Sequence, residues 1–256
     1  MTASQHEDVV QRQFGSQATA YLNSAVHAQG EEFVLLRETV AADAGAGARV
    51  LDLGCGAGHV SFQVAEFCDE VVAYDLSAQM LDVVARTAAE RGLDNIRTQQ
   101  GAAERLPFDD QAFDYVFSRY SAHHWRDVGQ ALREVRRVLR PGGAACFIDV
   151  VAPGLPLLDT HLQTVEVLRD TSHVRDYSPS EWARLVGEAG LVLTASKRQR
   201  LRLEFATWIE RMRTPDVFRE AILALQRSVG DEVREYFEIA ADGSFSTDVL
   251  VLWAER

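Results

Sequence analysis

A glycine-rich loop follows a short apolar run early in the chain and strongly limits the folds open to this sequence. The apolar run 50–53 leads directly into Gly54-Cys55-Gly56-Ala57-Gly58. Such an arrangement predicts a buried strand that turns tightly into a helix. Glycine lets the backbone approach a ligand closely, because it has no Cβ to collide with that ligand. The pattern therefore predicts a strand–loop–helix unit with a ligand at its loop.

A second apolar run delivers a carboxylate to the end of a neighbouring strand. Residues 71–74 precede Asp75, which comes 17 residues after Gly58. At that position a carboxylate can accept hydrogen bonds from both hydroxyls of a ribose. The combination of glycine loop and acid predicts a cofactor that contains adenosine.

The details of the loop favour one such cofactor over another. A dinucleotide fingerprint is Gly-x-Gly-x-x-Gly, but here the third glycine comes one residue early, and Asp52 lies in the strand before the loop. A carboxylate there repels a pyrophosphate and suits an ammonium group. S-adenosylmethionine carries an ammonium and a sulfonium and no phosphate, so we expect it as the cofactor. The glycines alone are also compatible with an NAD site or a plain strand–helix turn.

Several further blocks resemble one family, the class I S-adenosylmethionine-dependent methyltransferases. The blocks are Leu51–Gly58, Tyr74–Leu81, Leu106–Phe108, Phe113–Val116 and Leu132–Gly143. The chain is most similar to the small-molecule branch (methyltransferase type 11) that includes the ubiquinone and menaquinone C-methyltransferases. Within that branch it resembles uncharacterised bacterial methyltransferases, which share stretches such as Gln13–Ala18. The resemblance covers residues near 10–150 well and the remainder loosely, and it says almost nothing about the substrate.

Alternating strand and helix patterns predict an α/β fold with a parallel sheet. Strands are expected at 49–53, 71–75, 95–99, 113–118 and 144–151, and helices near 59–67, 77–91 and 127–139. Ser77 is a candidate N-cap, and Pro141-Gly142-Gly143 is expected to stop the last of these helices. The resemblance adds a sixth strand within 191–203 and an antiparallel seventh in Ser246–Ala254. We expect a doubly wound, mostly parallel, seven-stranded Rossmann-like sheet.

Three segments lie outside this core, namely residues 5–45, 155–176 and 205–240. They belong to connections that can reach over the carboxyl ends of the strands, where ligands bind in open parallel sheets. We therefore predict a single methyltransferase domain, residues 1–256, in which these segments form a helical lid. The alternative is that they cover apolar surface of the sheet.

The resemblance also implies cofactor contacts, residue by residue. Gly54, Cys55 and Gly56 would place backbone groups against the methionyl part beside Asp52, and Asp75 would hold the ribose. The remaining candidates would contact the adenine, the methionine ammonium or the closed lid; they are Tyr21, Leu76, Met80, Ala102, Ala103, Glu104, Ser118 and Arg119. Met80 is equally explained as a core residue, and Tyr21 as an aromatic anchor of its helix. Many relatives have Asp at the position of Ala102, so adenine recognition here would depend more on the backbone N–H of Ala103.

Two adjacent histidines, His123 and His124, follow the fourth predicted strand and face the expected reaction site. Histidine is the usual general base near neutral pH, so both are candidate catalytic residues. Adjacent side chains diverge in regular structure, and we expect at most one of them to point into the pocket. A structural hydrogen-bonding role is the alternative. Lower-ranked pocket candidates are His173, Arg175, Trp208, Arg211, Met212 and Arg213.

Composition limits the partners. The net charge of −12 opposes binding to a phosphate backbone. Ser118-Arg119-Tyr120-Ser121 stands where amino-directed nucleic-acid methyltransferases carry Asn-Pro-Pro-aromatic, so a small-molecule substrate is favoured. Three cysteines without metal-ligand spacing predict a reduced, cytoplasmic protein and no metal site. No signal pattern and no apolar run of about 20 residues is present, so no membrane association is expected. The oligomeric state stays open.

The leading hypothesis is methyl transfer to a small molecule by in-line displacement. A sulfonium is already an activated methyl donor, so the protein mainly has to align the acceptor and exclude water. A non-catalytic module that binds S-adenosylmethionine or S-adenosylhomocysteine is the first alternative. A nicotinamide-dependent oxidoreductase is the second, and the glycine spacing and Asp52 disfavour it.

Overall fold

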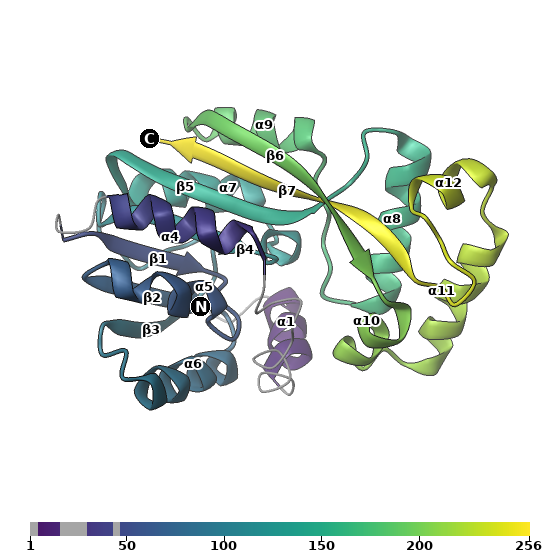
Figure 1. Ribbon diagram of the computed structural model, residues 1–256, viewed down its shortest axis with the longest axis horizontal. Coiled ribbons are helices and arrows are strands. Elements are labelled where there is room, and N and C mark those ends of the chain that lie inside the picture. The colour runs from purple at the N-terminus through teal and green to yellow at the C-terminus, as the bar shows by residue number, and fades with distance from the viewer. Residues whose placement is uncertain (1–4, 16–29, 43–46) are drawn as a thin grey trace.

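A seven-stranded sheet forms the centre of the molecule (Figure 1). The structure is a computed structural model that describes residues 5–15, 30–42 and 47–256. In spatial order the strands are β3 (Ile96–Gln100), β2 (Glu70–Asp75), β1 (Arg49–Leu53), β4 (Phe113–Arg119), β5 (Leu139–Val151), β7 (Phe245–Glu255) and β6 (Val192–Leu203). Strand β7 is antiparallel to both its neighbours, while the pairs from β3 to β5 are parallel. The predicted doubly wound sheet with an antiparallel last strand is confirmed.

Strand β5 begins earlier than the sequence indicated. Helix α7 (Val128–Val138) ends at Val138, and Leu139 already pairs with Phe113 of β4 in extended conformation. The Pro141–Gly143 segment therefore lies inside β5 and does not itself stop the helix. Leu139 is fully buried, so its packing in the core places the chain in the sheet before the proline is reached. The register between β4 and β5 shifts just after this point.

Helices cover both faces of the sheet. Side chains of Leu51, Leu53 and Val72 pack with α7 and α9 (Pro179–Glu188). The alternate residues of the same strands face the other helices: α4 (Glu32–Ala42), α5 (His59–Val64) with the 3₁₀ turn η1 (Ala65–Phe67), and α6 (Ala78–Arg91). This alternation follows the two-residue period of a strand. Ser77 caps α6 as predicted, since its side chain accepts a hydrogen bond from the backbone N–H of Met80.

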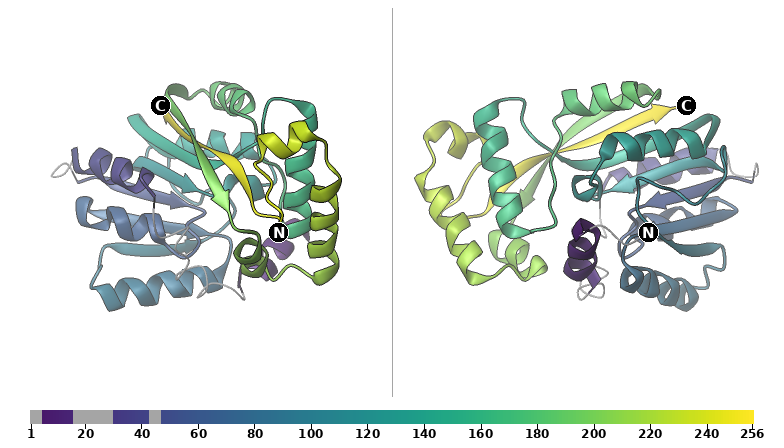
Figure 2. Two further views of the ribbon diagram at one scale, coloured as in Figure 1. Left: turned by 45° about the vertical axis from the view of Figure 1, so that its right-hand side comes forward. Right: turned by 180° about the vertical axis from the view of Figure 1, so that it is seen from behind.

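A second group of helices lies at one end of the twisted strand pair β6–β7 (Figure 1, Figure 2). It consists of α8 (Pro156–Arg169), α10 (Phe205–Met212), α11 (Asp216–Ser228) and α12 (Asp231–Tyr236). These helices pack on one another and on the ends of β6 and β7 around a core of their own. Helix α4, in contrast, buries Phe33, Leu36 and Val40 against the sheet. That part of segment 5–45 matches the sheet-covering alternative.

Helix α1 (Gln5–Gly15) bridges the two halves of the molecule (Figure 1, Figure 2). It packs near α6 on one side. On the other side, the side-chain amide of Gln13 donates to the carbonyl of Met212, 3.1 Å away. A ring nitrogen of His6 also lies 3.0 Å from the carbonyl oxygen of His124. Helix α1 thus spans the opening between the sheet and the helical group.

The order of the strands reverses between β1 and β4. From β1 the chain proceeds outward to β2 and β3, and then returns to start β4 on the other side. The carboxyl ends of β1, β2 and β4 consequently meet without a helix between them, which is where open α/β sheets bind ligands. Among the described residues, no helix combines the length and apolar character that crossing a membrane requires.

Candidate active site

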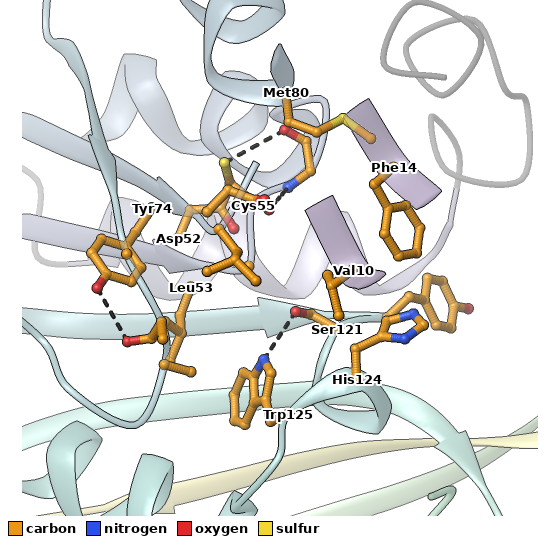
Figure 3. A pocket seen from close by; sticks show the side chains of 18 of the residues that line it. Val10, Phe14, Asp52, Leu53, Cys55, Tyr74, Met80, Ser121, His124 and Trp125 are labelled. Atoms are coloured by element: carbon orange, nitrogen blue, oxygen red, sulfur yellow. Dashed lines mark hydrogen bonds between the residues drawn. The ribbon is translucent and has the colours of Figure 1, made fainter. Parts of the chain in front are cut away.

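A cavity opens at the carboxyl ends of β1, β2 and β4 (Figure 3). We call it the loop cavity; its walls are residues 52–57, Tyr74–Leu76, Gly101–Glu104, Arg119–Ser121 and the inner face of α1. It encloses about 1080 Å³ including its open mouth. Val10 and Phe14 of α1 lie on one side and Leu53 and Cys55 on the other (Figure 3). Its walls thus include residues at or just after the carboxyl ends of β1, β2, β3 and β4.

The glycine loop has a backbone that other residues adopt with difficulty. Gly54 has φ 71°, and a Cβ there would overlap the side chain of Ser121. Gly58 caps α5 with φ 86°, and a Cβ there would lie 2.9 Å from Val84 of α6. Both positions need the left-handed conformation and close packing that glycine permits. The loop therefore brings its backbone directly against the cavity.

Asp75 holds the loop from the end of β2. One carboxylate oxygen accepts a hydrogen bond from the backbone N–H of Gly56, and the other from that of Ser77, both at 2.8 Å. Burial raises the pKa of Asp75, and these backbone hydrogen bonds oppose the increase. The side chain lines the loop cavity, as the sequence predicted for a ribose ligand. It also fixes the shape of the glycine loop.

Asp52 is buried at the end of β1 and lines the same cavity. Its Oδ2 accepts hydrogen bonds from the backbone N–H of Ser61 at 2.9 Å and from its hydroxyl at 2.6 Å. Burial raises the pKa of Asp52 to about 7, since the hydrogen bonds from Ser61 only partly offset the loss of solvent. A cation in the loop cavity would favour the ionised form.

The other predicted cofactor residues are distributed as follows. The residues that line the loop cavity are Gly54, Cys55, Gly56, Leu76, Met80, Ala102, Ala103, Glu104 and Arg119. Ser118 is buried and is not among the described residues of its walls. Tyr21 lies outside the described residues. Burial, followed by the nearby Asp75 and Asp52, raises the pKa of the Cys55 thiol, which favours a packing role over thiolate chemistry.

Arg119 is the last residue of β4 and lines the loop cavity, while its charge is paired with a residue of α4. Its guanidinium donates to Glu32 of α4, at 2.8 and 3.0 Å, and both side chains are about 5% exposed. The guanidinium also lies over the rings of Phe33 and Tyr120. The ion pair fastens α4 to the strand that precedes the histidines.

A second cavity adjoins the first. We call it the helix cavity; it encloses about 610 Å³ and lies between the turn after β4 and helices α8 and α10. Phe14, Tyr120 and His124 line both cavities, so these three residues form a shared wall. Phe14 stacks edge-on against His124, with 4.9 Å between the ring centroids. Tyr120 has a left-handed backbone, φ 51°.

Both predicted histidines line the helix cavity, in the 3₁₀ turn η2 (Ala122–His124). The expectation that their side chains diverge is wrong, because their ring centroids lie 4.1 Å apart. Asp149 of β5 binds Nδ1 of His123 at 2.6 Å, and the carbonyl of Ser172 lies 3.2 Å from Nδ1 of His124. Partners from two other segments therefore turn both rings to the same side.

The two histidines differ in charge. Burial alone would lower the pKa of His123, but Asp149, with Asp176 and Glu166 behind it, raises this pKa to about 9. Burial and the positive charge of His123 lower the pKa of His124 to about 4. Near neutral pH the site therefore pairs one protonated with one neutral imidazole.

Comparison with known proteins identifies the family. A family model described as a methyltransferase domain matches residues 51–147. The chain is 53% identical over 203 residues to the uncharacterised protein YafE of Escherichia coli, covering 79% of this chain and 98% of that one. It is 38% identical over 224 residues to the uncharacterised methyltransferase YcgJ of Bacillus subtilis, covering 88% of each chain. The crystal structure of YcgJ matches with a TM-score of 0.83 at 34% identity, over 88% of this chain and 97% of that one.

The chain belongs to the S-adenosylmethionine-dependent methyltransferases. The predicted family and enzyme class are thus confirmed, and S-adenosylmethionine is the cofactor. A demethylmenaquinone methyltransferase of Chlorobaculum parvum is also 33% identical over 111 residues, but this covers 43% of this chain and 44% of that one. The likeness to quinone methyltransferases is therefore partial.

The loop cavity of this methyltransferase fits its cofactor chemically. The wall carries two buried carboxyl groups, Asp52 and Asp75, which suit a cationic ligand. The cation of Arg119 is already paired with Glu32. At Gly56, unlike Gly54, the position that a Cβ would take is open, with nothing within 4 Å.

Sequence reasoning missed part of the site. Asp149, Glu166, Asp170 and Asp176 were not predicted, and Phe14 was noted only as part of a shared stretch. Of the lower-ranked candidates, Trp208 and Arg211 line the helix cavity. Arg175 instead donates hydrogen bonds to Asp159 and Glu181, and it is not among the described residues that line either cavity. The run Ile148–Val150 carries an acid inside an apolar strand, the one signal that marked Asp149.

Proposed function

We propose that this methyltransferase methylates a small molecule bound in the helix cavity. The observation that carries the proposal is the wall of Phe14, Tyr120 and His124, which belongs to both cavities. These three residues border the place where the two cavities meet, and in-line transfer needs the acceptor atom to come within roughly 3–3.5 Å of the methyl carbon there, so that proximity supplies much of the rate. The net charge of −12 further supports a small acceptor over a nucleic acid.

The cofactor contacts we propose follow the walls of the loop cavity. Asp75 holds the ribose hydroxyls, and the backbone of residues 54–56 holds the methionyl part with Asp52 near its ammonium. Leu76 and Met80 pack on the adenine, and the backbone N–H of Ala103 binds its edge. Arg119, whose side chain is engaged by Glu32, contributes its carbonyl. Bound there, S-adenosylmethionine supplies a methyl group on a sulfonium.

His123 is the proposed general base. Its Nδ1 is bound by Asp149, which leaves Nε2 as the ring nitrogen available to the helix cavity. An imidazole oriented in this way can accept a proton from an acceptor hydroxyl through Nε2. A pKa of about 9 matches this base to a weakly acidic group such as a phenol. His124, neutral at the shared wall, positions Phe14 and the acceptor.

Helix α1 acts as a lid over the site in this proposal. It closes one side of the loop cavity and contributes Phe14 to the wall between the cavities. Its contacts with Met212 and with His124 tie it to both halves of the molecule. A closed lid excludes water from the reacting groups.

The test is transfer of an isotope-labelled methyl group. The protein is incubated with a bacterial metabolite extract and labelled S-adenosylmethionine, and labelled products are sought by mass spectrometry. A labelled small molecule supports the proposal. If S-adenosylhomocysteine binds but no label is transferred, the alternative of a binding module is favoured.

The variant Asp75→Asn provides the structural control. It should weaken S-adenosylhomocysteine binding by about tenfold or more, because a ribose ligand and a loop contact are altered together. Asp82→Asn, on the exposed side of α6, should bind like the wild type. Equal binding by the Asp75 variant would refute the proposed ribose site.

A further inference from the structure

One carboxyl group in the helix cavity is not explained by the mechanism above. Asp176 is 1% exposed and lines the cavity. Its Oδ2 is buried and accepts no hydrogen bond from the part of the chain that the structure describes. A buried carboxyl oxygen without a donor is costly, and in native proteins such an atom usually marks a functional site.

The nearest basic group does not neutralise Asp176. Nε2 of His173 lies 3.9 Å from Oδ2, beyond hydrogen-bond distance. The same nitrogen lies 2.9 Å from the side-chain oxygen of Gln163, to which it donates. Burial lowers the pKa of His173 far below neutrality, so the imidazole carries no charge. Oδ2 of Asp176 therefore has no donor among the described residues, and the cation that favours its ionised form, His123, is already bonded to Asp149.

A second acid lies beside the first. Glu166 of α8 also lines the helix cavity and is 7% exposed. Its carboxylate is 3.6 Å from the guanidinium of Arg169, which donates through Nε to the carbonyl of Trp208. His123 is paired with Asp149, and Asp170 accepts hydrogen bonds from Ser172. Four carboxyls, Asp149, Glu166, Asp170 and Asp176, thus lie at or next to a cavity that three cationic side chains line, namely His123, Arg169 and Arg211. Asp176 is the acid among them with a buried oxygen to which no described residue donates.

We propose that the acceptor carries a protonated amine that binds to Asp176 and Glu166 in the helix cavity. The rest of the acceptor is apolar or aromatic, because the other walls include Leu201, Leu203 and Trp208. An ammonium supplies the hydrogen-bond donor that Oδ2 of Asp176 lacks and adds a positive charge beside the two carboxyls. The inference rests on the proposed function, in which the helix cavity holds the acceptor.

The position of the two acids makes the amine an anchor. Asp176 and Glu166 line the helix cavity, whereas the wall shared with the loop cavity consists of Phe14, Tyr120 and His124. An ammonium at the acids thus lies on the unshared side. The ammonium is thereby kept apart from the sulfonium, which lowers the repulsion between these two positive charges. The atom that receives the methyl group belongs to the other end of the acceptor.

Binding should displace a proton. Burial raises the pKa of Asp176 well above its usual range, and Glu166, Asp149 and Asp159 raise it further, while His123 opposes them. These effects disfavour the ionised form of the free carboxyl. An ammonium bound against it favours the ionised form, so the complex releases a proton to the buffer.

Calorimetry with the full-length protein saturated with S-adenosylhomocysteine tests the inference. Tyramine serves as the aminated probe, 4-ethylphenol as its neutral analogue and 3-(4-hydroxyphenyl)propanoate as its anionic analogue. We expect tyramine to bind at least about tenfold more tightly than either analogue. Titrations in buffers of different ionisation enthalpy should show proton release with tyramine and not with either analogue.

The variant Asp176→Asn keeps the shape of the carboxylic acid and removes its ability to ionise. It should weaken tyramine binding about tenfold, abolish the proton release and leave 4-ethylphenol binding unchanged. Asp248→Asn is the matched control, since Asp248 is a buried carboxyl of β7 that is bonded to Tyr236 and Arg200. Thermal melting of each variant establishes that it is folded.

The outcomes separate this inference from the proposed function. Failure of the wild type to bind S-adenosylhomocysteine would count against the cofactor site itself. Normal cofactor binding with equal affinity for the three probes would overturn the amine inference alone. Tighter binding of the propanoate would indicate an anionic acceptor, held instead by His123, Arg169 and Arg211, which line the same cavity. Tyramine binding that Asp176→Asn does not alter would also overturn it.

Discussion

The Nδ1 atom of His123 lies 2.6 Å from Oδ1 of Asp149, so a residue of the turn after β4 is oriented by the next strand of the sheet. The backbone N–H of His123 donates to the other oxygen of the same carboxylate at 3.3 Å. The pair is also largely buried, with 16% and 4% of the two side chains exposed. Asp149 thus orients the imidazole and makes the largest of the contributions that raise its pKa.

The first prediction concerns the pH dependence of catalysis. If His123 is the base, it acts only after losing its own proton, and its pKa is raised to about 9. The value of kcat/KM should therefore rise about tenfold for each pH unit below 9 and level off above it. The measurement is a pH profile of methyl transfer with the acceptor identified by isotope labelling.

Asp149→Asn should move the midpoint of this profile to lower pH. The substitution removes the nearest charge that raises the pKa of His123, while Asp176 and Glu166 keep a smaller part of the effect. His124→Gln should leave the midpoint in place, because His124 is neutral over this range with a pKa of about 4. A midpoint that is the same in the wild type and in Asp149→Asn would mean that another group titrates.

The second prediction concerns cofactor affinity. A cationic cofactor favours ionised Asp52, whose pKa is about 7 because burial, and to a lesser degree Asp75, outweigh Ser61 and Arg119. Affinity for S-adenosylmethionine should consequently fall as the pH drops below about 7 and be constant above it. Calorimetry across this range measures the effect. Asp52→Asn should bind more weakly at high pH and show a flatter profile.

The third prediction concerns the glycine loop. Gly54→Ala forces a left-handed backbone on alanine, at a cost of about 1–2 kcal/mol, and adds an overlap with Ser121. We expect lower stability in urea and loss of cofactor binding. The double variant Gly54→Ala/Ser121→Gly should recover part of the stability. Gly154→Ala, where a Cβ meets nothing within 4 Å and φ is ordinary, should behave like the wild type.

The fourth prediction concerns the buried ion pair. Glu32→Gln removes the negative charge opposite Arg119, and breaking a buried pair in this way costs about 3–5 kcal/mol. The free energy of unfolding in urea should fall accordingly. The neighbouring Glu31 lies 3.6 Å from Lys197 but is 86% exposed, so Glu31→Gln should not change stability measurably. Similar effects of the two substitutions would disprove a structural role for the Arg119–Glu32 pair.

Features that depend on short stretches of chain were predictable from the sequence. The cap at Ser77 involves a residue three positions away, and the loop of Gly54 and Gly58 follows directly from β1. The bond between Asp75 and Gly56 joins two blocks that the family resemblance already connected. In each case a local pattern specified the backbone. The parallel sheet followed from the alternation of strands and helices, and the sixth strand and the antiparallel seventh from the family resemblance.

Features that depend on distant partners were not predictable. His123 and Asp149 are 26 residues apart, and no local pattern shows that β4 and β5 bring them together. The divergence expected for His123 and His124 failed for the same reason, since Asp149 and Ser172 turn the two rings from different segments. The early start of β5 was set by burial of Leu139, which outweighed the proline and glycines that follow.

The two cavities are built from different parts of the chain. The family match ends at residue 147, and from Val150 to Arg211 the chain supplies most of the described residues around the helix cavity. The loops that surround the cofactor lie almost wholly before that boundary. Substitutions after Val150 can therefore reshape the helix cavity while the walls of the loop cavity keep their residues.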